Sequence, residues 1–235
     1  ALDFPWEKWT IFLHPAQRQW VERDYSGPSR VSGSAGTGKT IVALHRAVFL
    51  AQKNPESRIL LTTFSETLAY ALRTKLRRLI SNEPRLGERI EVHAIDAVAR
   101  RLYDLHFGPP KMASRERVAQ SLADAAGQVE GQKFSQSFLM AEWEEVVDAW
   151  QLDTWEAYRD VRRLGRKTRL REPQRALLWA IFAAVRAQLA AEGLVTPAEL
   201  FTRLAGRIAE RQHAPFEFVV VDEAQDLSVP QLRFL

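Results

Sequence analysis

The sequence predicts an α/β fold in which a parallel sheet flanked by helices is interrupted by a helical insertion. Three observations lead to this prediction. A short extended segment passes through a glycine-rich loop into a helical pattern near residue 40. An apolar run close to the C-terminus ends in acidic residues, which is typical of a strand buried in a parallel sheet. Between these regions, a stretch of roughly 110 residues carries helical periodicity and almost no strand pattern.

The first strand and helix of the sheet are expected at residues 29–51. Ser-Arg-Val-Ser at 29–32 is a short extended segment, and residues 41–51 carry apolar side chains at helical spacing. The glycine-rich loop lies between them. Strand, loop and helix in this order form the first unit of a parallel sheet.

Three further segments complete the predicted sheet. Residues 58–64 form the next strand, and the helix that follows, 66–80, places its leucines on one face. Residues 90–93 match a third, short strand. The clearest strand is Phe-Val-Val-Val-Asp at 218–222, which we expect in the centre of the sheet, buried on both faces.

The long stretch between these strands predicts a separate helical subdomain. Residues 143–150, for example, place tryptophans and valines on one helical face with acidic residues around them. Loops containing glycine and proline separate the helices. We therefore expect a discontinuous α/β core over residues 1–93 and 207–235, with an all-α insertion over 94–206.

The composition is that of a globular chain with a buried core. Of the 235 residues, 46% are hydrophobic and 26% are charged, and the net charge is only +4. This slight positive excess is compatible with a nucleic-acid partner, and an Arg-rich composition from a GC-rich genome explains it equally well. Because the chain has no cysteine, a disulfide framework and a Cys-based zinc site are excluded, which fits a cytoplasmic protein.

The chain shows no signal for secretion or membrane insertion. It begins with Ala1 rather than Met and without a signal peptide, which suggests a processed or excised piece. The longest apolar run, 176–185, is followed by Arg186 and is too short to span a membrane. We expect a buried helix there and no membrane partner.

Residues 33–40 match the phosphate-binding pattern G-x-x-x-x-G-K-[ST] in full. Glycines permit backbone angles that let main-chain N–H groups surround phosphate oxygens, and the next helix directs its positive dipole end to the same anion. Lys39 would reach the β- and γ-phosphates of ATP, and the Thr40 hydroxyl would bind Mg²⁺. A chance match is the alternative, but the strand–loop–helix context favours a nucleotide site. The predicted nucleotide-binding residues of the loop are Gly33, Ser34, Ala35, Gly36, Thr37, Gly38, Lys39 and Thr40.

Two acidic residues follow the last predicted strand. They can supply the metal-side carboxylate and the catalytic base that an ATP-hydrolysing site needs besides its phosphate loop. Asp222, at the end of an apolar strand, can hold the Mg²⁺ shell, and Glu223 can accept the proton of an attacking water. Alone, this pair would more often be a solvated strand end. Combined with a complete phosphate loop, it predicts a metal-side carboxylate and a catalytic base.

The same acidic segment carries a family resemblance. Asp-Glu-Ala-Gln-Asp at 222–226, followed by Gln231, resembles motif II of the UvrD/Rep-type superfamily 1 helicases, and residues 34–40 resemble their motif I. The resemblance implies a RecA-like motor domain with a helical insertion, ATP and Mg²⁺ as cofactors, and Gln225 as a further nucleotide-binding residue. Ile41 stands where UvrD itself commonly has Arg, so the segment looks more like the HelD, or helicase IV-like, branch.

Three more segments resemble motifs of this family. Leu-His-Pro-Ala-Gln at 13–17 resembles the Q motif, whose glutamine binds adenine; an amide suits this because it donates and accepts at once. By itself, Gln17 would be taken for a surface residue. Thr63 and Phe64 resemble motif Ia, where such residues contact single-stranded DNA, although Phe64 packed in the core is an alternative. His93 falls at motif Ib, and a purely structural histidine is equally compatible.

A dense basic cluster is a further candidate contact for DNA. Six cations lie in ten residues, at Arg162, Arg163, Arg166, Lys167, Arg169 and Arg171. Arg166 and Lys167, near its centre, are predicted to contact phosphates. A solvated basic face is an equally compatible explanation.

Together these motifs predict the ATP-binding half of a DNA helicase motor. By the resemblance, a second RecA-like domain of the same parent protein supplies arginines to the γ-phosphate, and the motor moves 3′ to 5′ on single-stranded DNA. The sequence ends at Leu235, so we expect weak nucleotide binding, slow hydrolysis and no unwinding from these residues alone. The competing hypothesis is a P-loop regulatory or RNA-polymerase-associated module. A small-molecule kinase is disfavoured by the glutamine of motif II and by the long insertion.

Overall fold

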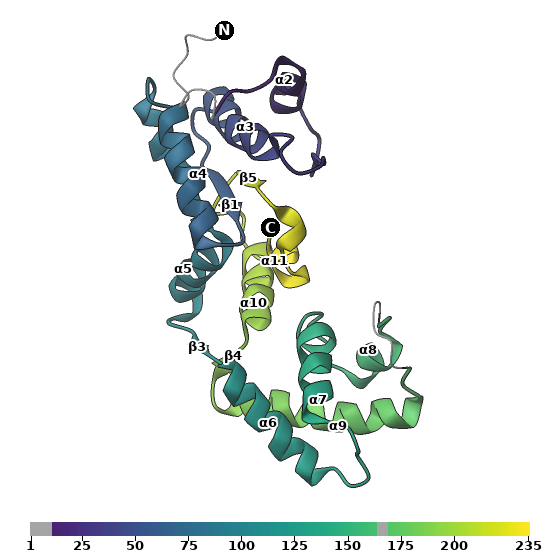
Figure 1. Ribbon diagram of the computed structural model, residues 1–235. Helices are drawn as coiled ribbons and strands as arrows, with labels where there is room; N and C mark the ends of the chain where they lie inside the picture. Colours follow the sequence, from purple (N-terminus) through teal and green to yellow (C-terminus); the bar gives the residue numbers. More distant parts are fainter. Residues whose placement is uncertain (1–10, 164–168) are drawn as a thin grey trace. The chain divides into compact units, whose positions relative to one another are not determined.

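A computed structural model of the chain describes residues 11–163 and 169–235 (Figure 1). The described residues divide into two compact units, with boundaries after Val98, Glu210 and Leu227. The first unit contains the main sheet and the helices around it. The second unit is built almost entirely of helices.

The sheet of the first unit has three parallel strands in the order β2-β1-β5. They are β1 (Ile59–Thr63), β2 (Ile90–Ala94) and β5 (Phe218–Val221). The central strand β1 is buried along its whole length. In the register, Leu61 lies opposite Val92 on one side and Val220 on the other. The predicted α/β class with a parallel sheet flanked by helices is therefore confirmed.

Helices α3 (Lys39–Lys53) and α4 (Glu66–Leu79) complete the core of this unit. Leu44 from α3 and Leu72 from α4 belong to the same buried cluster as Ile59 and Leu61 of β1. Burying one such leucine or isoleucine side chain contributes about 1.5–3 kcal/mol. Helix α2 (Pro15–Glu22), the short 3₁₀ helix η1 (Pro84–Glu88) and the start of α5 (Ile95–Phe107) also belong to this unit.

Two expectations about the sheet are wrong. Residues 29–32 form no strand, and Val31 is 41% exposed. This segment offers a single apolar side chain, too little to hold a strand by burial. As a result β5 is an edge strand of the described sheet rather than a central one, and Val219 is 38% exposed.

The second unit has a helical core built by α6 (Arg115–Gln128), α7 (Gln136–Glu142), α8 (Trp155–Asp160) and α9 (Glu172–Ala191). A π-helical turn, η2 (Trp143–Val147), continues α7. Aromatic rings fill the centre, where Tyr158 and Phe182 pack edge to face with their centroids 5.7 Å apart. The apolar run predicted as a buried helix lies within α9.

The remaining elements of the second unit include a small sheet that the sequence did not predict. Strands β3 (Lys111–Met112) and β4 (Leu194–Val195) pair in parallel, and each has only two residues, too few to produce a recognisable period. Helices α10 (Pro197–Ala209) and α11 (Val229–Phe234) pack together, with the rings of Phe201 and Phe234 5.5 Å apart. Within the described ranges, no helix combines the length and apolar character needed to cross a membrane.

Candidate nucleotide-binding site

The phosphate loop ends at the first residue of α3, so the N-terminus of that helix faces the loop. Gly36 (φ 77°) and Gly38 (φ 82°) adopt the left-handed conformation, which L side chains rarely tolerate. Among the described residues, the backbone N–H groups of Gly36, Gly38 and Lys39 donate no hydrogen bond. These donors and the helix dipole can therefore act together on an anion.

Lys39 is held inside the loop by the loop's own carbonyl groups. Its Nζ donates to the backbone oxygens of Gly33 and Ser34, each at 3.0 Å. The Thr37 hydroxyl donates to the same Ser34 oxygen at 2.8 Å. A side chain at Gly33 would place its Cβ 2.8 Å from the Thr37 hydroxyl oxygen, so only glycine fits this compact loop. The lysine amine is thus prepositioned where a phosphate would meet it.

Asp222 lies directly after β5 and contacts the Thr40 side chain. Its backbone N–H donates to the Thr62 oxygen at 2.9 Å, and its side chain is 7% exposed. Burial raises the pKa of Asp222, while a hydrogen bond with the Thr40 side chain opposes this effect and the nearby Glu223 charge adds to it. The structure therefore brings the two predicted metal-side oxygens together, although they are 182 positions apart in the chain.

This donor set fits magnesium. Mg²⁺ takes oxygen ligands and is commonly held by one or two carboxylates together with substrate phosphates and water. A hydroxyl and a carboxylate in contact below a phosphate loop match that preference. Among the described residues, no group of three or more His, Cys, Asp or Glu side chains is placed to hold a metal ion.

Glu223 follows in an unusual backbone conformation. Its φ of 56° puts a non-glycine residue in the left-handed region, a strain of roughly 1 kcal/mol or more. The Gln225 side-chain amide donates to the Glu223 carboxylate, and it also reaches Asp226 Oδ2 at 3.3 Å. The amide thereby restrains the carboxylate that the sequence identifies as the candidate base.

Gln17 contacts the phosphate loop from α2. Its Nε2 donates to the Thr37 oxygen at 2.7 Å, and its Oε1 accepts from the backbone N–H of His14 at 3.2 Å. A Cβ placed on Gly38 would lie 3.0 Å from the same Nε2. An amide carries a second N–H and a second lone pair, so Gln17 keeps one donor and one acceptor for a purine edge.

Those predicted DNA-binding residues that the structure describes lie at the ends of β1 and β2. Thr63 is completely buried, whereas Phe64 is 39% exposed, so Phe64 is not a core residue. His93 is partly exposed and its Nε2 lies 3.7 Å from Glu91 Oε2. Arg166 and Lys167 lie outside the described residues.

One cation of the basic cluster has an internal role that the sequence did not suggest. Arg163 is buried against Glu142, with its Nε 2.7 Å from Oε1, and the Tyr158 hydroxyl donates to that oxygen at 3.1 Å. Its partner is 21 positions away, beyond the reach of any local pattern. The cluster therefore offers fewer free cations than its composition indicates.

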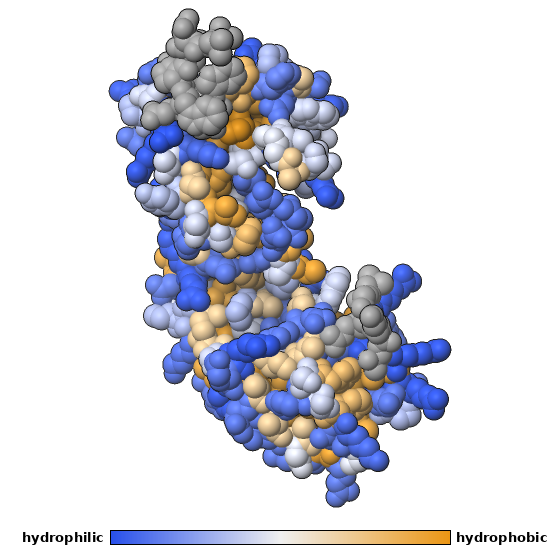
Figure 2. Space-filling view, viewed as in Figure 1, coloured by the Kyte–Doolittle hydropathy of each residue, from blue (hydrophilic) through white to orange (hydrophobic). Residues whose placement is uncertain are grey.

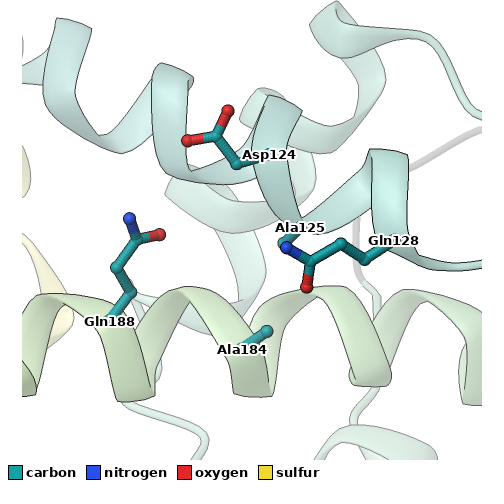
Figure 3. Close-up of a pocket in the computed structure, with 5 residues that line it drawn as sticks. All are labelled: Asp124, Ala125, Gln128, Ala184 and Gln188. Carbon is teal, nitrogen blue, oxygen red and sulfur yellow. The ribbon is translucent and has the colours of Figure 1, made fainter.

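The helical unit also contains an open polar groove of about 510 Å³ between α6 and α9 (Figure 3). Asp124 and Gln128 line it from α6 and Gln188 from α9, while Ala125 and Ala184 leave space between the helices. Asp124 already accepts a hydrogen bond from Gln120. Elsewhere, hydrophilic residues cover much of the visible surface, with apolar side chains between them (Figure 2). None of the predicted site residues lines this groove.

Comparison with protein families identifies the chain's relatives. A protein-family model, the UvrD/REP helicase N-terminal domain, matches residues 13–235. The match includes the Gln17 segment, the phosphate loop, the acidic segment after β5 and all the helices of the second unit. A comparison with curated proteins finds none that matches the chain.

Proposed function

The chain belongs to the UvrD/REP helicase N-terminal domain family, which supports a helicase and ATPase role, and from this premise we propose a more specific function. The chain forms the ATP-binding part of a motor that couples ATP hydrolysis to movement on single-stranded DNA. The proposed direction is 3′ to 5′, by resemblance to the family. A second RecA-like domain would complete the ATP site with its arginines.

ATP binding is supported chiefly by one observation. Side chains from three distant parts of the sequence, Gln17, Lys39 and Asp222, all contact the phosphate loop or the first turn of the helix that follows it. Each contact joins a residue type to the part of ATP that its chemistry suits. Gln17 would face the adenine ring. Lys39 would contact the β- and γ-phosphates, and Asp222 would face the Mg²⁺ ion.

The proposed chemistry assigns one task to each remaining residue. Mg²⁺, held by Thr40 and Asp222, would neutralise charge on the phosphates. Glu223 would accept the proton of the attacking water. Gln225 would hold the Glu223 carboxylate in place, since its amide already donates to that group. Residues 33–38 would supply backbone contacts to the phosphates.

Single-stranded DNA is proposed to bind at Phe64, whose exposed ring follows β1 directly. Stacking a base on such a ring contributes roughly 1–3 kcal/mol with little dependence on sequence. His93 is assigned to the same DNA-binding region by family resemblance, and Arg166 and Lys167 to the phosphate backbone. The resemblance also assigns Thr63 to this region, but its side chain is completely buried, so Phe64 rather than Thr63 is proposed to contact DNA. Phe64 and His93 each lie at or just beyond the carboxyl end of a strand.

Lys39→Ala tests the ATP assignment. We expect the Mg²⁺-dependent affinity for a fluorescent ATP analogue to fall at least about tenfold, because a charged hydrogen bond to phosphate is lost. Lys53→Ala, on the same helix, is the matched control, since Lys53 pairs with Asp24 on the surface. Equal affinity for the analogue in Lys39→Ala and the wild type would exclude the proposed site.

Binding to DNA separates the motor from a P-loop regulatory or RNA-polymerase-associated module. We expect Phe64→Ala to weaken binding to a labelled oligothymidine by about 5- to 100-fold. Phe107→Ala removes another exposed phenylalanine ring and serves as the control. If neither Phe64→Ala nor charge reversal at Arg166 and Lys167 changes the affinity, the regulatory alternative is favoured.

A further inference from the structure

Two adjacent threonines of β1 are both completely buried, yet only one has a hydrogen-bond partner. The Thr62 hydroxyl donates to the backbone oxygen of His93 at 2.8 Å, which joins β1 to β2. The Thr63 hydroxyl has no partner among the described residues. A buried polar atom without a partner costs free energy that a valine of the same shape would avoid. Packing alone therefore does not explain a threonine at position 63.

The register of the sheet places Thr63 beside Asp222. Strands β1 and β5 pair in parallel with Thr62 opposite Val221, so the next pair in the same register is Thr63 and Asp222. The hydrogen bond from the Asp222 backbone N–H to the Thr62 backbone oxygen extends the pairing of the two strands to this position. Cross-strand neighbours point their side chains to the same face of a sheet.

That face is the one on which α3 packs. Ile59 and Leu61 of β1 belong to the buried cluster that includes Leu44 of α3, and Val220 of β5 packs against it. Because side chains alternate along a strand, Thr63 continues the row of Ile59 and Leu61. The apolar face therefore ends in two polar residues, and α3 begins close to them with Lys39 and Thr40.

We propose that Thr63 is a positioning residue of the nucleotide site, whose hydroxyl donates to the Asp222 carboxylate when magnesium and nucleotide are bound. The inference rests on the proposed ATP site. In the nucleotide-free chain, the Thr40 side chain lies close enough to Asp222 to oppose the rise that burial causes in the pKa of its carboxyl. A carboxylate accepts more than one hydrogen bond, so a second donor can hold Asp222 in place when the nucleotide site is occupied. The Thr63 hydroxyl, on the neighbouring strand, is a donor that has no partner among the described residues.

Magnesium titration at a fixed concentration of a fluorescent ADP analogue tests this role, with Thr63→Val as the main variant. We expect the Mg²⁺ midpoint to rise about fivefold, the loss of roughly one hydrogen bond. Affinity measured in EDTA is expected to stay unchanged. The melting temperature of the nucleotide-free protein is expected to hold or rise, because the unpaired hydroxyl is removed. Thr63→Ser, which keeps the donor, is expected to retain the wild-type midpoint.

Thr62→Val is the matched control, since it removes the paired hydroxyl of the adjacent residue. We expect it to lower the melting temperature and to keep the Mg²⁺ midpoint within about twofold of wild type. Thr63→Cys, with a weak donor of similar size, replaces Thr63→Val if valine prevents folding. An unchanged midpoint in folded Thr63→Val or Thr63→Cys overturns the proposed role of Thr63 alone. A wild-type protein that binds no nucleotide overturns the ATP site and this inference together.

Discussion

Gln17 and Thr37 are joined by a 2.7 Å hydrogen bond from the side-chain amide of the first to the backbone oxygen of the second. The bond connects α2 to the middle of the phosphate loop, twenty residues further along the chain. In the proposed site, adenine recognition and the shape of the loop would therefore depend on the same side chain.

Gln17→Ala is expected to weaken binding of the ATP analogue about tenfold and to reduce the preference for ATP over GTP. The substitution removes both the loop contact and the remaining amide groups available to a purine. Competition titrations with the two nucleotides measure both effects. Gln19→Ala is the control on the same helix, because the Gln19 side chain donates to the backbone oxygen of Ala16 within α2 rather than to the phosphate loop. Wild-type affinity in Gln17→Ala would separate this residue from the nucleotide.

Two glycine substitutions are expected to change stability in opposite directions. Gly38→Ala forces a left-handed conformation on alanine and brings its Cβ against Gln17, at a cost of about 1–2 kcal/mol. The melting temperature should fall by about 2–8 °C. Gly206→Ala lies within α10, meets no neighbouring atom, and should stabilise the protein by about 0.5–1 kcal/mol. Calorimetry measures the melting temperature of both variants. A higher melting temperature for Gly38→Ala than for the wild type would contradict the left-handed conformation of the loop at this position.

Asp148 is expected to make the stability of the helical unit depend on pH. Burial raises its pKa to about 6, against hydrogen bonds from Thr196 and Gln151, each at 2.7 Å to Oδ1. The neutral acid is favoured in the folded state, so its stabilising contribution is complete below the unfolded pKa of about 3.9. The contribution is lost as pH rises through about 6, by at most about 3 kcal/mol.

Asp148→Asn removes this titration and keeps an oxygen that can accept both hydrogen bonds. Urea denaturation at pH 4 to 8 should show the wild type losing stability relative to the variant across the interval from about 4 to about 7. Glu144→Gln, which breaks an exposed pair with Arg115, controls for a general loss of charge. A constant difference between Asp148→Asn and wild type over this interval would contradict the prediction.

Arg163→Met is expected to destabilise the protein by about 3–5 kcal/mol, because it removes the buried guanidinium that pairs with the buried Glu142 carboxylate. The double variant Glu142→Met with Arg163→Met should recover most of that loss, since both members of the buried pair are removed together. Arg159→Ala, at an exposed pair with Asp160, should change the stability little, because solvent screens the pair. Denaturant melts give all three values. A double variant no more stable than Arg163→Met would show that packing, not charge, dominates there.

Local sequence is sufficient to predict those parts of the candidate site that depend only on which residue types occur at which spacing. The phosphate loop needs glycines at left-handed positions, and the pattern of residues 33–40 identifies them. The strand predicted at 58–64 is confirmed as β1, which the structure buries along its whole length. The acidic segment after β5 was located correctly, although the strand itself is at an edge of the described sheet.

Features that depend on distant partners could not be predicted in this way. Arg163 looked like a surface cation because nothing near it in sequence indicates Glu142. The contrast between Thr62 and Thr63 appears only when β2 and β5 are placed on either side of β1. Residues 29–32 match a strand by their place before a phosphate loop, yet they form no strand in the structure.

The position of β5 at the edge of the described sheet has a consequence for handling the protein. Beyond β1, its backbone N–H and C=O groups have no partner strand in the described part of the chain, and Val219 presents an apolar side chain beside them. An open edge of this kind is a template on which a strand from another molecule can add. Concentrated samples should therefore aggregate through β5, and a lysine at position 219 should keep them monodisperse.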